Sequence, residues 1–384
     1  MSGADENAAD PTGGVVLLAA AAVALGIANS PLAAGYRHVL HAPLTVGAGT
    51  WAFTRPAEWF VNDVLMAVFF YVVGLEIRHE VSHGSLSAWR RAALPLTAAV
   101  GGALVPALIY LGFSGPGPAH AGWGVPMATD IAFALGVLAL LGKRVPNALR
   151  VLLLALAVID DLIAILVIAF FYSSGIALAG LLVAGAGLAL ILILQAFGVR
   201  NKAVYLLPAF IAWAGTYAAG VHPTIAGVLV GMLTPLNTVG NEATSPAAYW
   251  ISALHPWVSF LIMPLFALTN AGVTLGGASG SAGGMGVALG VFVGLVLGKP
   301  VGILLSSVAV LRLKIASLPS ELGLRHLLVL GVLAGIGFTM SLFVAQLAFS
   351  DAALLDSAKL AVLAASGSAM VLGLVVGRAL LKAN

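Results

Sequence analysis

Two adjacent aspartates, Asp160 and Asp161, interrupt a long apolar stretch of the chain. Nine apolar residues precede them, from Val151 to Ile159, and eleven follow, from Leu162 to Tyr172. A charged carboxylate at the centre of a membrane-spanning helix costs roughly 2.5 to 3.5 kcal/mol on insertion scales. Because buried carboxylates bind protons and hard cations, the pair predicts an ion-binding or proton-binding site inside a membrane.

Two further charged residues, Asp130 and Lys299, lie within apolar stretches. Lys299 stands about thirteen residues from the outer end of its stretch, which is further than a lysine side chain extends, so it needs a buried partner in Asp160 or Asp161. Neighbours on a helix diverge by about 100°, so one aspartate can bind the lysine while the other faces an aqueous cavity. Asp130 could balance the partial positive charge of helix N-termini that meet at a crossing. A static ion pair that only joins two helices is the alternative for Lys299 and Asp160.

Protons and an alkali cation would compete for such a site. Nearby carboxylates raise each other's affinity for protons, and a nearby ammonium group lowers it. Carboxylate oxygens suit a small alkali cation, and the Thr129 hydroxyl or freed backbone carbonyls would complete the coordination shell. Competition combined with alternating access is sufficient for exchange transport.

The composition indicates a polytopic membrane protein. Of the 384 residues, 61% are hydrophobic and only 8% are charged, and the mean hydropathy is +1.09, so a soluble domain could not cover its own surface. Residues 1–13 are polar and lack a signal-peptide pattern, so we expect a cytosolic tail before a single transmembrane domain over 14–384. The chain has no cysteine, which excludes disulfides and thiolate metal sites. We expect no cofactor and no enzymatic activity.

Twelve apolar stretches are candidates to cross a bilayer, some of them short or interrupted. Twelve spans would place both termini on one side, and we expect this side to be the cytoplasm because thirteen of the seventeen basic residues would then face it. This distribution explains the isoelectric point near 9.3 without a nucleic-acid partner. The expected spans are approximately 14–29, 57–78, 93–113, 121–142, 148–173, 175–198, 203–219, 222–235, 249–272, 286–311, 325–348 and 357–380.

The fourth and eleventh spans carry helix-breaking residues beside hydroxyl side chains. Pro126 precedes Thr129 in the fourth span, and two glycines lie within 335–341 in the eleventh. Membrane helices are interrupted in this way where their backbone lines a cavity. The two spans occupy matching places in two three-span units, 93–173 and 286–380, that would cross the membrane in opposite directions. The sequence therefore predicts inverted repeats with unwound helices four and eleven, and two helices kinked only for packing are the alternative.

Several segments together resemble the signature of the NhaA-type sodium/proton antiporters. They occur in the order typical of that family and cover nearly the whole chain. The segments are Ala128–Gly136, Ala157–Leu162, Gly74–Glu76, Gly220–His222, Leu254–Trp257, Gly298–Pro300 and Gly335–Ser341.

The resemblance implies an all-α fold of twelve helices, in which helices four and eleven are unwound and cross near the bilayer centre. It implies that Asp161 is the principal carrier of the cation and of protons, and that Asp160 assists it and pairs with Lys299. Thr129 and Asp130 match family residues at the crossing. The implied activity is electrogenic exchange at the bacterial inner membrane, in which the proton gradient expels sodium or lithium. Asp161 and Asp160 are thus also the expected ligands of the transported cation.

The resemblance also implies activation at alkaline pH. The chain departs from the family pattern at residues 79, 251 and 252, so the family's pH profile cannot be carried over. Solvation of a helix end explains the charged residues near the end of the second span equally well, and a turn explains the histidine before Pro223. The pH-response candidates are Glu76, His79, Glu80, His222 and His255.

The family forms homodimers through a β-hairpin between the first two spans, and the expected counterpart here lies within residues 41–55.

The main alternative function is a sodium-coupled symporter of similar fold, because broken and crossed helices also serve carriers of organic anions. A symporter needs no buried lysine paired with an aspartate, and this favours exchange. An intramembrane aspartyl protease is disfavoured because its Gly-x-Gly-Asp motif is absent from the chain.

Overall fold

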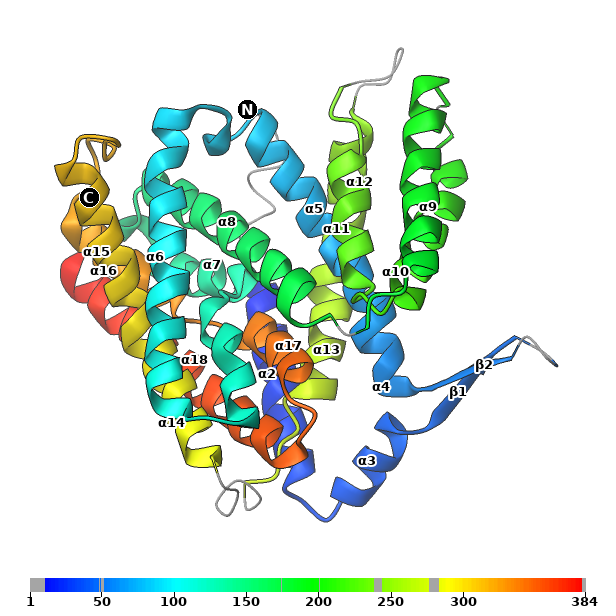
Figure 1. The fold of residues 1–384 in the computed structure, drawn as a ribbon. Helices are drawn as coiled ribbons and strands as arrows, with labels where there is room; N and C mark the ends of the chain where they lie inside the picture. Colours follow the sequence, from blue (N-terminus) through cyan, green and yellow to red (C-terminus); the bar gives the residue numbers. More distant parts are fainter. Residues whose placement is uncertain are drawn as a thin grey trace. The chain divides into compact units, whose positions relative to one another are not determined.

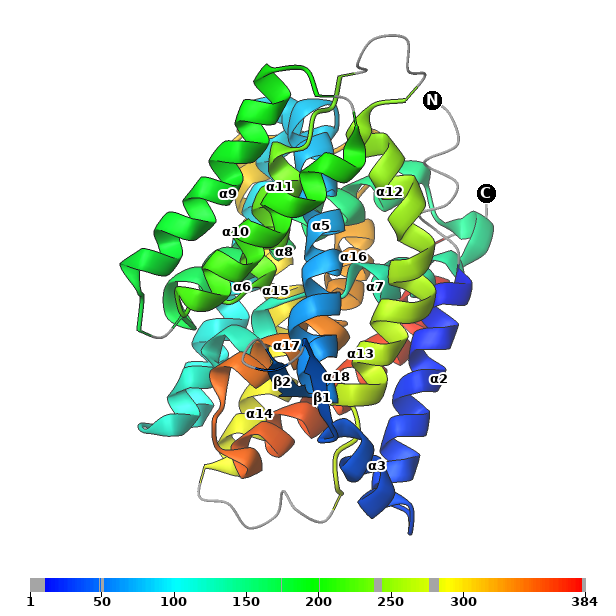
Figure 2. The same ribbon diagram turned by 90° about the vertical axis from the view of Figure 1, so that its right-hand side faces the viewer.

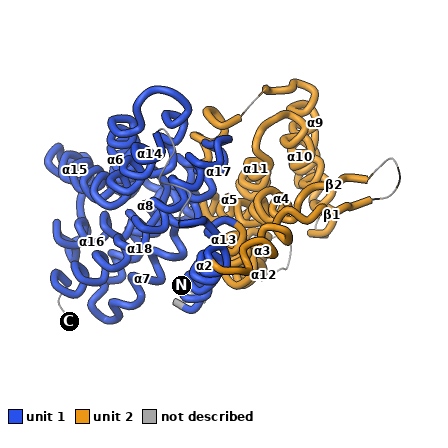
Figure 3. Tube along the Cα trace, turned by 90° about the horizontal axis from the view of Figure 1, so that it is seen from below, with its two compact units in different colours: residues 1–29, 80–164, 270–384 blue, residues 30–79, 165–269 orange. Residues whose placement is uncertain are grey.

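Helices make up most of the computed structural model (Figures 1 and 2). By their internal contacts they form two compact units that alternate along the chain (Figure 3). Unit 1 comprises residues 1–29, 80–164 and 270–384, and unit 2 comprises residues 30–79 and 165–269. The structure describes residues 11–47, 49, 52–173, 175–199, 201–237, 244–275 and 283–381.

Unit 1 contains both interrupted helices and the charged residues that lie within apolar stretches. The most extensive helix packing in unit 1 is between α6 and α15. Gly101 and Gly302 face each other there so closely that a side chain on either would overlap the backbone of the other helix. This approach also brings the Lys299 side chain against α6, close to Gly102. The elements of unit 1 are α2 (Pro11–Ala28), η3 (Ser85–Ser87), α6 (Trp89–Ser114), η4 (Pro118–Met127), α7 (Ile131–Ala139), η5 (Gly142–Arg144), the greater part of α8 (Asn147–Phe171), α14 (Gly284–Val293), η9 (Gly294–Gly298), α15 (Lys299–Arg312), α16 (Leu324–Ala334), α17 (Phe338–Ala348) and α18 (Ala352–Leu380).

The fourth expected span is interrupted, as the sequence predicts. Its first half, η4, is a 3-10 helix of ten residues, and its second half, α7, is an α-helix inclined at 42° to it. Residues 128–130 between them are not helical. Runs of 3-10 helix are usually no longer than three or four residues, so η4 is unusually long. The sequence did not predict that the first half of this span departs from the α-helix over its whole length.

The eleventh expected span is interrupted in the same way. Its halves, α16 and α17, are inclined at 48°, and Gly335 to Gly337 separate them. The two interruptions are in direct contact, because the backbone N–H of Asp130 donates to the carbonyl of Ile336 at 2.7 Å. The two predicted breaks are therefore present and meet within unit 1.

The expected number of twelve spans is not confirmed. Among the described residues, seven helices are long and apolar enough to cross a membrane, or up to ten if each bent pair counts as one span. The expected span 203–219 corresponds to η6 (Lys202–Tyr205) followed directly by α10 (Leu206–Ala218), and the expected span 222–235 corresponds to α11 (Thr224–Leu233), which has 10 residues. At 1.5 Å per residue α11 is only about 15 Å long, whereas the hydrocarbon core is about 30 Å thick.

Unit 2 contains the remaining helices and the expected hairpin. Strands β1 (Pro43–Val46) and β2 (Phe53–Pro56) pair antiparallel, with Val46 opposite Phe53, and residues 48, 50 and 51 lie outside the described part. The other elements of unit 2 are α3 (Ala33–Leu40), α4 (Ala57–Trp59), η2 (Phe60–Leu65), most of α5 (Met66–Ser82), α9 (Leu178–Ala196), η6 (Lys202–Tyr205), α10, α11, α12 (Pro246–Trp257), η7 (Val258–Ile262) and most of α13 (Met263–Asn270).

The first helix in the described part of the chain begins slightly earlier than the sequence predicts. We expected the first span to start at residue 14, and α2 starts at Pro11, where proline is favoured because the first helical amide needs no partner. Of the expected tail over residues 1–13, residues 1–10 lie outside the described part.

Candidate ion-binding site

A buried ion pair joins α8 to α15. The ammonium nitrogen of Lys299 lies 2.5 Å from Oδ2 of Asp160, and the exposed fractions of the two side chains are 0% and 1%. Lys299 also donates to the backbone carbonyl of Met127, the last residue of η4. Of the two partners that the sequence allowed for Lys299, the structure selects Asp160, and it adds a carbonyl at the break in helix four.

The Thr129 hydroxyl links both breaks to this ion pair. Its oxygen lies 2.5 Å from Oδ2 of Asp160 and 2.9 Å from the carbonyl oxygen of Ala334, so its single proton can be donated to either. Thr129 is fully buried. The other carboxylate oxygen of Asp160, Oδ1, is buried and makes no hydrogen bond with a described residue. Asp160 therefore has one oxygen engaged by two donors and one that could accept a ligand.

Asp130 caps two helices at once. Its Oδ1 accepts from the backbone N–H of Phe133 at 3.0 Å, in the first turn of α7. Its Oδ2 accepts from the backbone N–H of Thr339 at 3.1 Å and from the Thr339 hydroxyl, in the first turn of α17. A helix N-terminus carries about half of a positive charge, so two of them together balance about one carboxylate. The expected placement of Asp130 at meeting N-termini is present.

The backbone carbonyls that the breaks release are taken up by donors in the same region. A buried carbonyl without a donor costs several kcal/mol in an apolar medium, so interrupted helices need such donors. Four carbonyls near the breaks therefore have a donor within hydrogen-bond distance in this conformation, and each carbonyl oxygen keeps a second lone pair that could bind a cation. The pairs, donor first, are Ser341 hydroxyl to Val125, Lys299 to Met127, Thr129 hydroxyl to Ala334 and Asp130 N–H to Ile336.

Asp161 follows Asp160 on α8 and is equally inaccessible, with 1% of its surface exposed. It interacts electrostatically with Lys299, although Asp160 makes the direct contact. Because neighbouring side chains on a helix diverge by about 100°, the two carboxylates present different faces of α8 to their surroundings. Asp130, Asp160, Asp161 and Lys299 are therefore arranged around one junction within unit 1.

Resident metal ions are usually held by three or more His, Cys, Asp or Glu side chains. In the described part of the chain, no three residues of the metal-binding types His, Cys, Asp and Glu are close enough to hold an ion together. A transported cation has different requirements, since it must be released after binding. Two adjacent carboxylates supplemented by a hydroxyl group suit such a transient hard cation.

Several features of the junction were not predicted from the sequence. The residues before Lys299 form a π-helical segment, η9, and such segments are frequent at functional sites. Pro300 is the signal that could have indicated it, since proline donates no hydrogen bond to an α-helical ladder. The contacts of Thr339 and Ser341 join residues more than 200 positions apart, so no local pattern could have predicted them.

The pH-response candidate His222 lies apart from the candidates on α5. Glu76, His79 and Glu80 lie toward the end of α5, where Glu80 is buried and His79 is exposed. His255 lies on α12. His222 instead faces Asp63, near the start of the continuous helix Ala57–Ser82. Thirteen residues separate Asp63 from Glu76, which corresponds to about 20 Å along a helix.

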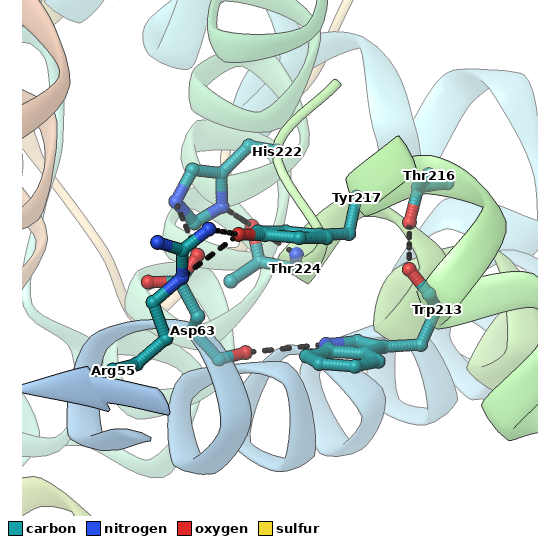
Figure 4. Close-up of polar contacts among 7 residues, drawn as sticks. All are labelled: Arg55, Asp63, Trp213, Thr216, Tyr217, His222 and Thr224. Carbon is teal, nitrogen blue, oxygen red and sulfur yellow. Dashed lines mark hydrogen bonds and ion pairs between the residues drawn. The ribbon is translucent and has the colours of Figure 1, made fainter. Parts of the chain in front are cut away.

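His222 belongs to a polar cluster in unit 2 (Figure 4). Its Nε2 lies 3.7 Å from a carboxylate oxygen of Asp63, and its Nδ1 lies 2.8 Å from the Thr224 hydroxyl. The Trp213 indole donates to the backbone carbonyl of Asp63 at 3.3 Å. These contacts tie the turn between α10 and α11 to η2. The sequence analysis did not predict this pairing.

We expect that His222 does not sense pH by protonation in the neutral to alkaline range. Burial lowers the pKa of His222 to about 4 from its ordinary 6.5, so the ring stays neutral there and its protonation destabilises the fold only below about pH 6.5. In His222→Asn, an amide can retain the contact with Thr224. This variant should keep the pH at which cation-dependent proton movement is half-maximal, measured in membrane vesicles. A displaced midpoint would contradict the assignment.

The fold and the junction together define a class of protein. Secondary transporters typically form their ion sites where interrupted membrane helices meet beside buried charges. The comparisons with known proteins identify the family. The chain matches the family model described as Na+/H+ antiporter 1 over residues 6–376, and it therefore belongs to this family. The family resemblance read from the sequence is thus confirmed.

Relatives named as Na(+)/H(+) antiporters are similar to this chain over almost its full length. The chain is 52% identical to Na(+)/H(+) antiporter NhaA 2 of Myxococcus xanthus (strain DK1622), covering 96% of this chain and 87% of the relative. It is 52% identical to Na(+)/H(+) antiporter NhaA of Acidovorax sp. (strain JS42), covering 96% and 90%. It is 46% identical to Na(+)/H(+) antiporter NhaA of Escherichia coli O1:K1 / APEC, covering 95% and 94%.

Proposed function

We propose that this chain is a sodium/proton antiporter that also accepts lithium. The observation that carries the proposal is the buried Asp160 and Asp161 pair, with Lys299 bound to Asp160, at the crossing of two interrupted helices. Membership of the Na+/H+ antiporter 1 family supports the same activity. Sodium, lithium and protons are its substrates, the bilayer is its setting, and no cofactor is needed.

The proposed mechanism is competition between cation and protons for Asp160 and Asp161. Oδ1 of Asp160 is buried and makes no hydrogen bond with a described residue, which makes it suitable as a cation ligand. A cation bound there would draw negative charge away from Lys299 and weaken the ion pair. When protons bind the carboxylates instead, the cation loses its charged ligands and leaves. Alternating access then couples the two fluxes.

The carboxylates have unequal roles in this proposal. Asp161 is the principal carrier, as the family resemblance implies, and Asp160 assists it and releases Lys299 during transport. Asp130 is a helix cap, because both of its oxygens are engaged by the first turns of α7 and α17. It holds the crossing together and takes no proton in the cycle. Thr129 connects that crossing to Asp160 and provides a hydroxyl ligand.

We also propose the finer architecture that the sequence indicates. Residues 93–173 and 286–380 are inverted repeats of a twelve-helix transporter with both termini in the cytoplasm, embedded in the bacterial inner membrane. The order of elements supports this: in each repeat an interrupted helix lies between two long ones. Exchange is electrogenic and regulated by pH. The candidates near the end of α5, Glu76, His79 and Glu80, together with His255, remain proposals for that regulation.

A homodimer formed through the hairpin is part of the proposal. Leu44, Val46 and Phe53 on the two strands have exposed fractions of 44%, 58% and 38%, so the hairpin offers apolar surface to a second copy. Arg55 on β2 anchors the hairpin to α10, since its guanidinium donates to the Tyr217 hydroxyl at 2.5 and 3.1 Å (Figure 4). An anchored hairpin loses less conformational freedom on association.

Transport in everted membrane vesicles tests the proposed function. Vesicles that contain the protein and have an established interior-acid proton gradient should lose part of that gradient when sodium or lithium chloride is added. Choline chloride serves as the control for salt and chloride. A sodium-coupled symporter would move no protons in this assay. Absence of a cation-dependent response from mildly acidic to alkaline pH would refute antiport.

A further inference from the structure

The second half of the broken helix eleven begins without a cap of its own. Helices usually start with Ser, Thr, Asp or Asn, whose side chain accepts from an amide of the first turn. Here Gly337 occupies that position. An added Cβ at Gly337 would lie 2.2 Å from the Ser341 hydroxyl oxygen and 3.0 Å from the Ala128 carbonyl oxygen, so its surroundings leave little room for a capping side chain. The first amides of α17 must therefore find their acceptors on other elements.

Two side chains from elsewhere in unit 1 supply these acceptors. The hydroxyl oxygen of Ser366, on α18, accepts from the backbone N–H of Phe338 at 3.0 Å. Asp130 accepts from the next amide, that of Thr339, at 3.1 Å. Ser366 is buried, with 2% of its surface exposed, so water does not replace it. Two consecutive amides of α17 are thus held by two different elements.

Ser366 differs in this respect from other serines of α18. The hydroxyl of Ser357 donates to the carbonyl of Ala353 at 2.8 Å, and the hydroxyl of Ser368 donates to that of Ala364 at 2.8 Å. Both are bonds to the residue four positions earlier in the same helix, which serine commonly makes. The described bond of Ser366 instead connects α18 to α17. Ser357 is equally buried, at 1%, and is therefore a matched control.

The start of α17 is connected to the ion pair by a short series of contacts. The ring of Phe338 packs against that of Phe133 on α7, with centroids 5.5 Å apart. Asp130 bonds both helix starts, and the preceding residue, Thr129, contacts Asp160. We infer that Ser366 is a positioning residue, which fixes the start of α17 and thereby the crossing beside Asp160. The inference adds a residue to the proposed function and rests on it.

Transport kinetics of Ser366→Ala test the inference against Ser357→Ala. Removal of the Ser366 acceptor leaves the Phe338 amide buried without a partner, and the start of α17 is then free to shift. We expect an apparent KM for sodium raised by about 5- to 10-fold, the lower end of what the loss of one buried hydrogen-bond partner causes. Ser357→Ala should keep the KM within about twofold, because its hydroxyl only bonds within its own helix. Equal KM values for the two variants would overturn the inference.

A second measurement separates this inference from the proposed function. Ser366→Ala and Asp130→Asn act on adjacent amides of one helix end, so their shifts in thermal unfolding temperature should be less than additive when combined. Ser357→Ala combined with Asp130→Asn should be additive. This cycle needs no transport and remains informative if the wild type does not exchange. Additivity in both pairs would overturn the inference even if exchange is observed.

If Ser366→Ala does not accumulate as folded protein, Ser366→Cys takes its place in both measurements. The thiol is somewhat larger than the hydroxyl and its sulfur is a weak acceptor, so the KM should still rise, by less than for alanine. A wild-type KM together with additive thermal shifts in Ser366→Cys would overturn the inference.

Discussion

Asp161→Asn is expected to abolish cation-dependent proton movement. Asparagine matches aspartate in shape, but it neither carries a negative charge for the cation nor takes up a proton at physiological pH. A cation would then meet a single carboxylate, Asp160, that is already bound to Lys299 at 2.5 Å. Adding sodium or lithium to everted vesicles with an established proton gradient should give no more response than choline.

Asp351→Asn is the matched control for this substitution. Asp351 is exposed and caps α18 through bonds from the amides of Ala353 and Leu354 at 2.8 and 3.1 Å. Asparagine caps a helix about as well as aspartate, so this variant should exchange like the wild type. Protein amounts in the vesicles are compared by immunoblot. Normal exchange by Asp161→Asn at equal amounts would mean that another group carries the ions.

The charged residues of the junction could be predicted because charge is conspicuous in an apolar chain. Asp130, Asp160, Asp161 and Lys299 are buried in the structure, as their surroundings in the sequence indicate. Membrane helices tolerate such residues only where they are paired or functional, so each one signals a site by itself. The same holds for the breaks, which proline and glycine indicate locally. Local signals of this kind need no knowledge of the fold.

The contacts that hold the junction could not be predicted in the same way. Ser366 looks like any small polar residue of a membrane helix, and only the absence of a cap on Gly337 makes its hydroxyl necessary. The Met127 carbonyl as a second acceptor for Lys299 likewise depends on how α15 meets η4. These contacts join segments that are distant in the sequence. Their existence follows from tertiary packing and not from composition.

The exact ends of the helices could also not be predicted from apolar composition. The stretch 222–235 looks longer than α11, the helix of 10 residues that forms within it, whereas the stretch 203–219 matches the continuous helical segment of η6 and α10. The turn before α11 depends on Gly220, whose φ of +75° is accessible to glycine, and on the proline that follows His222. Composition reports where a segment is apolar, whereas turn geometry decides where its helix ends.

Lys299→Ala is expected to destabilise the protein strongly, by about 3 to 5 kcal/mol, because removal of one partner of a buried ion pair leaves the other charge uncompensated. Asp160 would remain buried with only the Thr129 hydroxyl as a donor among its described contacts. The Met127 carbonyl would lose the donor that satisfies it at the break. Thermal unfolding of the purified protein in detergent measures the effect. Lys143→Ala is the control, since Lys143 is exposed and its loss should leave the unfolding temperature unchanged.

Adding Asp160→Asn to the Lys299→Ala background separates the charge from the packing. The additional substitution removes the uncompensated carboxylate, so the double variant should regain much of the thermal stability that Lys299→Ala loses. It should nevertheless remain inactive, because the cation then lacks a charged ligand at position 160. If Lys299→Ala unfolds at the wild-type temperature, the pair does not hold α8 to α15. In that case Lys299 can release Asp160 at little cost in free energy. The ion pair would then oppose the conformational change of alternating access less than its burial implies.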